Sequence, residues 1–401
     1  MSSEHARPGT RNPLPAYFIR GGTSKGIFLN AKDLPRDRTQ WTDIFCGIMG
    51  SPDPHERQLD GMGGGLSSLS KIVVVEASQR SGVDLEYTFA QVGIKDRSID
   101  LAGNCGNLSS AVGPYALESG ILPRQSYQPQ GPPELESSSS TTLSLLNTNT
   151  NKLINTTFPS HLNIANSNSS FSLDGVGGTG ARIVMDYLEP GGARTGKLFP
   201  TGNKIDNISV TLPVSPAAGI ANAVDTNIPI TLLDCSNPTV YVRFSDLGFE
   251  PSDSVSPKLF DERILLLLET IRRRGTELMG LDPQHQSQPK IALVGPPVDY
   301  ELLSGDRQGR GRIDIFIRAL SMGQPHKAVP MTVAMATAVA ARIPGTIVSQ
   351  VVNLPRDSEV VRIGHPSGSV AVGADITPDG HVKAAKVFRT ARILMRGDVY
   401  W

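Results

Sequence analysis

The sequence predicts an α+β protein of two similar halves, each a curled sheet wrapped round one buried helix. The chain has 401 residues, more than one ordinary hydrophobic core accommodates, and this length indicates two domains. Short runs of β-branched residues recur along the chain and are typical of strands. Each half also contains one helical stretch with small or apolar residues on nearly every side, and such a helix is a buried one.

The charge balance excludes some classes of partner. Hydrophobic residues make up 39% of the chain and charged residues 19%, which is typical of a globular protein with a core. The 38 basic residues equal the 38 acidic residues in number. Nucleic acids and anionic membranes attract proteins with a basic excess, so we expect neither as a partner.

The cysteines and the N-terminal residues indicate the cellular compartment of the protein. Cys46, Cys105 and Cys235 are too few and too widely spaced for a disulfide framework or a metal site built on CxxC. Free thiols fit a reducing compartment. The first residues, MSSEHARPGTRNPLP, lack the apolar region of a secretory signal, and no apolar run reaches the roughly eighteen residues that span a membrane. We therefore expect a cytoplasmic protein.

The first half contains four predicted strands and one predicted helix. Residues 17–29 (YFIRGGTSKGIFL) read as two short strands around a turn of Gly, Ser and Thr. The runs at 71–76 and 85–94 have strand length and composition. A helix is expected from Leu108 to Glu118, with Gly120 as its C-terminal glycine.

Two polar stretches are predicted to be loops. Between residues 125 and 151 the composition shifts to Ser, Thr, Pro, Gln and Asn, which indicates a surface insertion or a disordered loop. Residues 166–170 (NSNSS) read as a second loop tip. Neither stretch has a basic or aromatic pattern, so we assign no function to them.

The second half repeats the arrangement with two helices. Residues 260–279 predict an amphipathic helix with Leu265, Leu268, Ile271 and Leu278 on its apolar face and residues 272–274, all arginine, toward solvent. Residues 328–342 (AVPMTVAMATAVAAR) predict the buried helix of this half.

Cys105 is the first candidate for chemistry. It lies in GNCGNLSSAVGPY (103–115), directly before the predicted helix, where unpaired backbone N–H groups and the helix dipole favour a thiolate. Gly103 and Gly106 would let a ligand approach the backbone closely. The alternative is a small buried residue at a tight turn. Cys46 and Cys235 have apolar neighbours and are expected in the core.

Lys71 is the second candidate. It ends the Gly- and Ser-rich segment DGMGGGLSSLSK (60–71) and begins an apolar strand. A desolvated amine there would have the lowered pKa that a general base needs. The alternative is a surface lysine whose stem packs on the strand while its amine stays in water.

A third motif, RGGTSKG (20–26), brings backbone N–H groups, two hydroxyls and two cations together and suits a carboxylate or a phosphate. It lacks the spacing of a P-loop, and no GxGxxG opens a helix, so nucleotide binding is not predicted. His326 and His365 lack the spacing of metal ligands, so neither a metal nor another cofactor is expected.

Taken in order, the motifs resemble the PrpF family of aconitate and methylaconitate isomerases over nearly the whole chain. Any one of them is weak evidence, and the ordered set is specific. The set consists of IRGGTSKG (19–26), GSPDP (50–54), DGMGG…SSLSK (60–71), FAQV (89–92), GNCGNLSSAVGP (103–114), PTGNKID (200–206), MGL (279–281), SMGQPH (321–326), IPGT (343–346), GHPSG (364–368) and TARILMRG (390–397).

The resemblance implies a fold and a domain division. The family is similar to diaminopimelate epimerase, with two like domains, each a curled sheet around a central helix, and the site between them. It implies one domain over residues 1–189 joined by 386–401, and a second over 190–385. The family pairs a lysine with a cysteine, and Lys71 and Cys105 match those positions. SMGQPH, the corresponding turn of the second half, has no cysteine, so a mechanism with two thiols is excluded.

The resemblance and the motifs together imply the residues that bind substrate. Asn237, in DCSNPTVYV (234–242), matches a substrate-binding asparagine segment of the wider superfamily. One carboxylate would be held by the turn at 20–25, a second by the segments around Lys71 and Cys105, and the second domain would close the site. The residues are Arg20, Gly21, Gly22, Thr23, Ser24 and Lys25; Met62, Ser67, Ser68, Asn104, Gly106 and Asn107; and Asn237, Ser321, Met322, Gly323 and His326.

The predicted activity is a cis–trans or allylic isomerisation of aconitate or 2-methylaconitate, or another small unsaturated di- or tricarboxylate, without a cofactor. Lys71 would remove a proton and Cys105 would return one, with roles that can exchange with direction. Two alternatives stay open: an isomerase or cyclase acting on another unsaturated acid of specialised metabolism, and a carboxylate-binding protein without catalysis. A homodimer is also compatible with the sequence.

Overall fold

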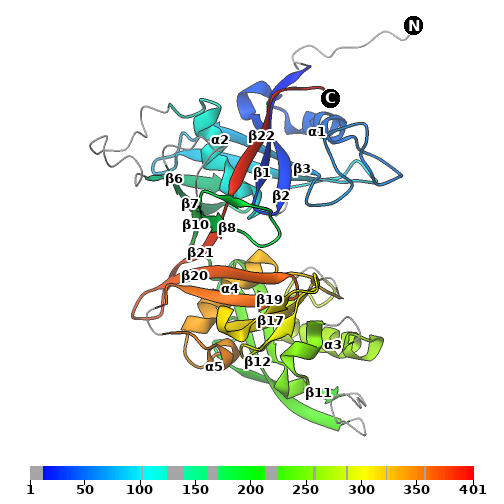
Figure 1. Ribbon diagram of the computed structural model, residues 1–401, viewed down its shortest axis with the longest axis vertical. Helices are drawn as coiled ribbons and strands as arrows, with labels where there is room; N and C mark the ends of the chain where they lie inside the picture. Colours follow the sequence, from blue (N-terminus) through cyan, green and yellow to red (C-terminus); the bar gives the residue numbers. More distant parts are fainter. Residues whose placement is uncertain are drawn as a thin grey trace. The chain divides into compact units, whose positions relative to one another are not determined.

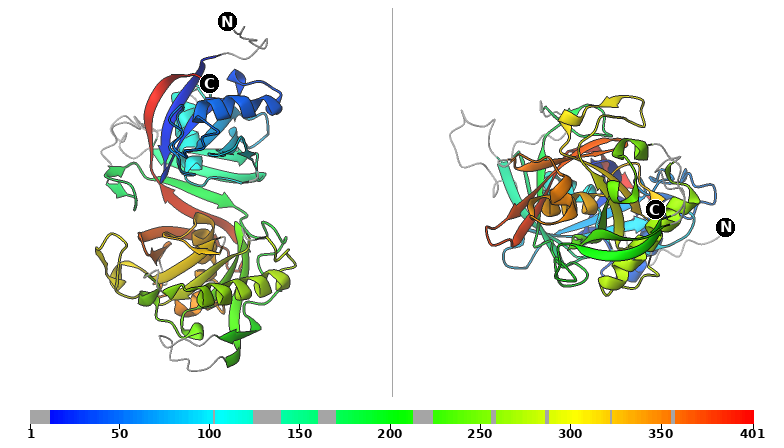
Figure 2. Two further views of the ribbon diagram at one scale, coloured as in Figure 1. Left: turned by 90° about the vertical axis from the view of Figure 1, so that its right-hand side faces the viewer. Right: turned by 90° about the horizontal axis from the view of Figure 1, so that it is seen from below.

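The computed structural model describes residues 12–101, 103–123, 140–159, 170–212, 224–255, 259–285, 288–321, 323–355 and 358–401. The chain divides into two compact units. Unit 1 consists of Met1–Tyr187 and Phe388–Trp401, and unit 2 of Leu188–Val387. The C-terminal strand therefore belongs to unit 1, where red β22 lies beside blue β1 (Figures 1 and 2).

Unit 1 is built on one mixed sheet in which most neighbours are antiparallel. The pairs β2–β3 and β4–β6 are parallel. The expected strands at 17–29, 71–76 and 85–94 are confirmed. In order across the sheet, the strands are β22 (Ala391–Val399), β1 (Leu14–Gly21), β2 (Ser24–Asn30), β3 (Lys71–Ala77), β4 (Leu85–Val92), β6 (Ser140–Asn147), β7 (Lys152–Pro159) and β10 (Ile183–Leu188).

The helical segment at the centre of unit 1 is shorter than expected. Its first turn is the 3₁₀ helix η3 (Leu108–Ala111), and the α-helix α2 covers Val112–Glu118. Pro114 has no N–H to donate to the carbonyl of Ser110, so an α-helical bond is missing at this point. The segment is buried against β1, β2, β3 and β22, and Gly120 follows it with φ +75° as a C-terminal glycine.

The prediction of one loop over 125–151 is wrong for its second part. Residues 124–139 lie outside the described residues, but 140–147 form β6, which pairs with β7 and β4. Thr141, Leu143 and Leu145 alternate with more exposed residues and are buried. The polar composition hid this period-two pattern, which is the one that builds a strand. The predicted loop tip at 166–170 lies outside the described residues except for Ser170.

A second core of unit 1 lies under α1 (Trp41–Met49). The inner face of α1 carries Ile44, Phe45 and Ile48 and packs on residues of β1, β2, β3 and β4. Cys46 belongs to this core, as predicted. Trp401 closes it so tightly that a side chain at Gly47 would meet its backbone at 2.8 Å. The end of the chain is therefore part of the packing of unit 1.

Unit 2 has the same layout. Its central helix α4 (Met331–Arg342) is buried along nearly its whole length against β12, β13, β19 and β20, which confirms the predicted buried helix. Most strand pairs are antiparallel, and β13–β14 and β17–β19 are parallel. The strands are β11 (Asp206–Leu212), β12 (Val224–Cys235), β13 (Asn237–Arg243), β14 (Lys290–Gly295), β17 (Ile315–Ser321), β18 (Gln324–Pro325), β19 (Val360–His365), β20 (Gly368–Ile376) and β21 (Val382–Arg389).

The helix α3 (Glu262–Leu278) confirms most of the predicted apolar face, because Leu268 and Ile271 are buried and Leu265 packs against the core. The core-facing residues are Ile264, Leu267, Leu268 and Ile271, whereas Leu278 is 45% exposed. Arg272 is also buried, and its guanidinium donates to both carboxylate oxygens of Glu269 at 2.7 Å, so the prediction of a solvated arginine is wrong there. The bidentate ion pair lets a charged side chain lie in the buried face.

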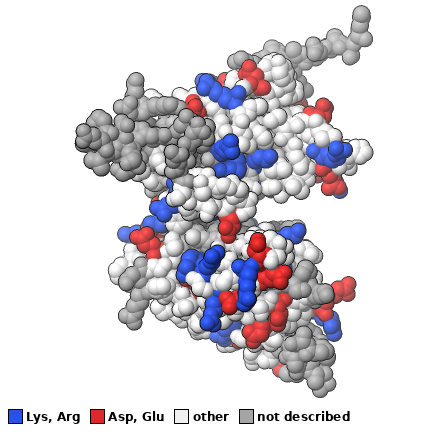
Figure 3. Space-filling view, viewed as in Figure 1, with Lys and Arg blue, Asp and Glu red and all other residues white. Residues whose placement is uncertain are grey.

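Three further properties complete the description of the fold: its class, its surface charge and the character of its helices. Helices and mixed sheets in two units confirm the predicted α+β class. Acidic and basic side chains are interspersed on the face in Figure 3, in keeping with a formal net charge of zero. Among the described residues, none of the helices has the length and apolar character needed to cross a membrane.

Candidate functional site

Lys71 lies at the start of β3, directly opposite Gln91 of β4. Its side chain is buried, with 8% of its surface exposed. The amine Nζ donates a hydrogen bond to Oε1 of Gln91 and lies 4.9 Å from the centroid of the Phe89 ring. The alternative of a surface lysine with its amine in water is therefore excluded.

The surroundings of Lys71 disfavour the charged ammonium form of its side chain. Burial lowers the pKa of Lys71 from its ordinary value, and a charge interaction with Cys105 raises it by a smaller amount. These two effects account for the shift. Cys105 is thus the charged partner that opposes the effect of burial on the Lys71 pKa.

Cys105 precedes η3 and is partly exposed, whereas Cys46 and Cys235 are buried in the two cores, as predicted. Burial raises the pKa of Cys235 to about 12 and also raises that of Cys46, so both stay protonated thiols near neutrality. Ser109 donates to the Cys105 carbonyl from its backbone nitrogen at 3.0 Å and from Oγ at 2.9 Å. The backbone of Cys105 is therefore held by Ser109, while the residue stays partly exposed.

Behind Cys105 lies a buried hydroxyl network. The Tyr87 hydroxyl contacts the Ser109 hydroxyl at 2.9 Å and donates to Oδ1 of Asn104 at 3.1 Å, and Ser109 also donates to that Oδ1 at 3.0 Å. Burial raises the pKa of Tyr87 far above its ordinary value, so it stays a neutral donor. The amide oxygen of Asn104 therefore accepts hydrogen bonds from two side chains of unit 1.

The turn between β1 and β2 packs directly on η3. A side chain at Gly21 would meet the Asn107 carbonyl oxygen at 2.6 Å, and Gly22 has φ +52°, which favours glycine. Nδ2 of Asn107 donates to the Thr23 hydroxyl at 3.0 Å. Ser24 is buried beside this contact. The predicted residues of the turn therefore meet the Cys105 segment.

The two cations of this turn differ in their surroundings. Nη1 of Arg20 donates to the carbonyl and the hydroxyl of Thr390 and to the Gly22 carbonyl, at 2.9 to 3.0 Å. Arg20 therefore braces the turn against the start of β22. The Lys25 amine lies 5.6 Å from the centroid of the Phe18 ring, and its backbone nitrogen donates to the Ser68 carbonyl at 3.0 Å.

Gln58 holds the Gly- and Ser-rich segment before Lys71 in place through hydrogen bonds. Nε2 of Gln58 donates to the hydroxyls of Ser51 and Ser70, and its Oε1 accepts from the Gly65 nitrogen at 3.0 Å. Ser67 is exposed and Ser68 is half-buried. Met62 is half-buried against the core under α1, and Gly106 is half-buried beside Cys105.

The remaining predicted site residues belong to unit 2. Asn237 begins β13, is 6% exposed, and its Oδ1 has no hydrogen-bond partner among the described residues. His326 is exposed, and its Nδ1 lies 2.9 Å from the Ala328 carbonyl. Gly323 has φ +70° in the open turn between β17 and β18. Ser321 ends β17, and Met322 lies outside the described residues.

With this geometry established, comparison with known proteins decides the family. The family model described as "PrpF protein" matches residues 12–401. The chain belongs to the PrpF family.

The relatives of this PrpF protein are isomerases. It is 34% identical over 395 residues to the 3-methylitaconate isomerase of Eubacterium barkeri, covering 96% of this chain and 97% of the relative. It is 35% identical over 407 residues to the 2-methyl-aconitate isomerase of Shewanella oneidensis, covering 96% of each. It is 31% identical over 399 residues to the (4E)-oxalomesaconate Delta-isomerase of Novosphingobium sp. (strain KA1), covering 98% and 99%. The chain is accordingly an enzyme of the isomerase class.

A solved relative shares the fold of this PrpF protein. The crystal structure of methylitaconate-delta-isomerase matches it with a TM-score of 0.81 at 33% identity, over 98% of this chain and 96% of the other. The α+β architecture of this chain is therefore shared with methylitaconate-delta-isomerase.

Sequence reasoning missed two residues of the site in this PrpF protein. Gln91 lies in the quoted motif FAQV, and the structure pairs it with Lys71 across β3 and β4; no signal in the sequence marks that pairing. Arg389 precedes the quoted TARILMRG, is 4% exposed, and donates from Nε to Oδ1 of Asn107 at 3.1 Å. Burial lowers the pKa of Arg389 to about 10, while Tyr187 and Cys105 raise it by smaller amounts.

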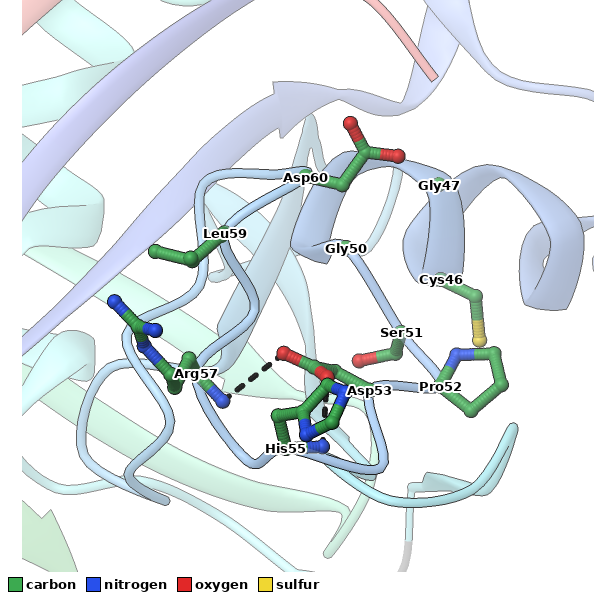
Figure 4. Close-up of a pocket in the computed structure, with 10 residues that line it drawn as sticks. All are labelled: Cys46, Gly47, Gly50, Ser51, Pro52, Asp53, His55, Arg57, Leu59 and Asp60. Carbon is green, nitrogen blue, oxygen red and sulfur yellow. Dashed lines mark hydrogen bonds between the residues drawn. The ribbon is translucent and has the colours of Figure 1, made fainter.

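The motif GSPDP (50–54) lies elsewhere in unit 1, at a cavity of about 390 Å³ beyond the end of α1 (Figure 4). The Asp53 carboxylate accepts from the backbone nitrogens of His55, Arg57 and Gln58, so it shapes this loop. Among the described residues, no group of three or more His, Cys, Asp or Glu side chains is placed to hold a metal ion.

Proposed function

We propose that this PrpF-family isomerase acts on a small unsaturated di- or tricarboxylate of the aconitate, methylaconitate or methylitaconate kind. The reaction is a cis–trans or allylic isomerisation by proton transfer through Lys71 and Cys105, without a cofactor. The observation that carries the proposal is the buried amine of Lys71, whose pKa is lowered by burial and which interacts electrostatically with Cys105. A general base must be neutral at the working pH, and burial favours the neutral amine.

The names of the relatives support this substrate class. Methylitaconate, methylaconitate and oxalomesaconate are all unsaturated acids with more than one carboxylate. A C–H bond between an alkene and a carboxylate is weakly acidic, because its anion spreads over the allylic carbons and onto the carboxylate oxygens. Fixed N–H donors and cations stabilise that charge where it develops.

The proposed proton transfers balance without an added reactant. The neutral Lys71 amine takes the proton from the allylic carbon and becomes an ammonium, and the substrate becomes a delocalised anion. The Cys105 thiol gives a proton to the far allylic carbon, which shifts the double bond and leaves a thiolate. For cis–trans isomerisation, the anion rotates about the carbon–carbon bond that was double in the substrate before it is reprotonated. A proton passing from the Lys71 ammonium to the Cys105 thiolate, directly or through water, restores the starting state.

Unit 1 supplies the groups for the substrate carboxylates in this proposal. The exposed Thr23 hydroxyl and the Lys25 amine lie on the turn that packs on η3. The hydroxyls of Ser67 and Ser68 lie on the segment that leads to Lys71. Arg20, Asn104 and Asn107 have hydrogen bonds within unit 1, so we assign them to holding these segments in place as much as to the ligand.

We assign to unit 2 the recognition of the remaining part of the substrate. Asn237 fits this role because its buried Oδ1 has no hydrogen-bond partner among the described residues, and a buried acceptor without a partner is costly. Gly323 and His326 lie on the turn that follows β17.

Deuterium exchange tests the proposed chemistry. The enzyme is incubated in D₂O with trans-aconitate, 2-methylaconitate or methylitaconate, and deuterium uptake and isomer composition are followed by proton NMR. Uptake at the allylic position together with isomerisation supports the proposal. Ligand binding without any uptake would point to a carboxylate-binding protein, and uptake with another unsaturated acid alone would move the substrate assignment to that acid.

A further inference from the structure

Gln91 has a place beside Lys71 that the proposed mechanism has not used. The two residues are directly paired in the register of β3 and β4, so their side chains leave the same face of the sheet. The Lys71 amine donates to Oε1 of Gln91. We propose that Gln91 is the positioning residue of the reaction: it holds the Lys71 amine through a neutral oxygen acceptor, which keeps the amine able to act as a base.

The orientation of the Gln91 amide is set by its other contacts. Nε2 of Gln91 donates to the Ser70 carbonyl at 2.8 Å and to the Ser67 carbonyl at 3.2 Å. Carbonyl oxygens accept and do not donate, so the NH₂ group must face them and the oxygen must face Lys71. The same amide thereby ties the Ser-rich segment to the catalytic lysine. A flipped amide would lose both bonds and present a donor to an amine that is already a donor.

Among the described residues, none of the groups recorded as acting on the Lys71 amine is a carboxylate. On β4 the neighbours are Gln91 and the Phe89 ring, 4.9 Å from the amine. On β2, Gly26 lies against the Lys71 backbone, and the Lys25 amine lies over the Phe18 ring. Cys105, before η3, is the titratable group whose charge affects the Lys71 pKa. Glutamine therefore stands where a glutamate of nearly the same shape would form an ion pair.

The choice of amide over carboxylate decides the charge of the base. An opposite charge within about 4–6 Å favours the charged form of an amine and shifts its pKa by about 1–3 units. A carboxylate at position 91 would thus hold Lys71 as an ammonium, which cannot accept a proton. The amide oxygen orients both the neutral amine and the ammonium without such a bias, because either form donates a hydrogen bond to it.

The test compares Gln91→Glu with Gln91→Met, and this inference rests on the proposed function of Lys71. For Gln91→Glu we expect kcat at pH 7 to fall at least about tenfold and to recover as the pH is raised, because deprotonation restores the base. For Gln91→Met we expect a lower kcat with a smaller change in KM and no upward shift of the pH profile. Gln79→Glu is the matched control: it adds the same charge to the exposed far end of the same hairpin, roughly 25 Å away along the strands.

A second measurement separates this inference from the proposed function. The pH dependence of Lys71 acetylation by acetic anhydride, read by peptide mass spectrometry, follows the amine without any substrate. A midpoint at higher pH in Gln91→Glu than in the wild type and Gln79→Glu supports the role of Gln91. An unchanged midpoint, or a Gln91→Glu defect that is equal at every pH, overturns it. Full turnover in Lys71→Ala would instead overturn the proposed function and leave the acetylation result to stand.

Discussion

Asn107 and Arg389, separated by 282 residues, meet through a hydrogen bond of 3.1 Å from Nε of Arg389 to Oδ1 of Asn107. The amide nitrogen of Asn107 donates to the Thr23 hydroxyl at 3.0 Å. One side chain therefore joins the Cys105 segment, the turn between β1 and β2, and the C-terminal segment of unit 1. These three segments are far apart in the sequence and carry much of the candidate site.

Removing this link should loosen both fold and site. Asn107→Ala leaves the buried Arg389 without one acceptor, and a buried polar group that loses its partner costs about 1–3 kcal/mol. We expect a lower midpoint of chemical denaturation and a reduced kcat/KM. Asn203→Ala, at an exposed asparagine of unit 2, is the control and should change neither. Equal denaturation midpoints for Asn107→Ala and the wild type would show that the link contributes no stability.

Lys71→Ala should lose turnover while the protein stays folded. The loss of a positioned general base typically lowers the rate by about 10² to 10⁴. Steady-state kinetics and circular dichroism measure the two properties, and Lys32→Ala serves as the control because Lys32 is an exposed lysine of the same unit. A folded Lys71→Ala enzyme with wild-type kcat would remove Lys71 from the mechanism.

Lys71 should also make stability depend on pH. Because burial lowers its folded-state pKa below the value in the unfolded chain, the unfolded chain binds more protons between those two values, and stability rises with pH across that window. At pH values below this window Lys71 is charged in both the folded and the unfolded chain, so burial of the ammonium lowers the free energy of unfolding by its full amount. Lys71→Met should therefore be more stable than the wild type near neutrality, by a margin that shrinks as pH rises through the window. Denaturation midpoints at several pH values measure this, and a margin that grows with pH would contradict it.

Cys105 should be the reactive thiol. It is partly exposed while Cys46 and Cys235 are buried, so iodoacetamide should modify it first, and trans-aconitate should protect it. Peptide mapping after limited alkylation shows which cysteine reacts. Cys105→Ser should lower kcat more than it changes KM, since a hydroxyl is a far weaker acid. Earlier modification of Cys46 or Cys235, or no protection by ligand, would make Cys105 a structural residue.

The strand β6 should be needed for stability. Leu145 is fully buried, and Leu145→Ala should cost about 2–5 kcal/mol. Leu153→Ala on the neighbouring strand β7 is the control, because Leu153 is 37% exposed and should cost much less. Deletion of 140–147 should abolish cooperative unfolding. A melting temperature unchanged in Leu145→Ala would mean that β6 does not pack as described.

The sequence by itself determined the class of fold, the two buried helices and the catalytic candidates. The catalytic candidates rested on their motifs and on the resemblance to the PrpF family. Local periodicity was sufficient for the fold class and the helices, because an all-round apolar helix such as 331–342 or a β-branched run such as 71–77 carries its own burial signal. It was insufficient for β6, whose polar residues outnumber the alternating apolar ones in composition. It also misplaced Arg272, because a buried guanidinium depends on its ion pair with Glu269.

The tertiary structure decided how the candidate residues act on one another. Lys71 is a buried amine rather than a surface lysine because β4 places Gln91 and Phe89 against it, and no spacing along the chain reveals that pairing. Arg389 reaches Asn107 because β22 returns the end of the chain to β1. Burial and charge interaction depend on distance in space, so the pKa of Lys71 and the engagement of Arg20, Asn104 and Asn107 in hydrogen bonds arise from the folded chain alone.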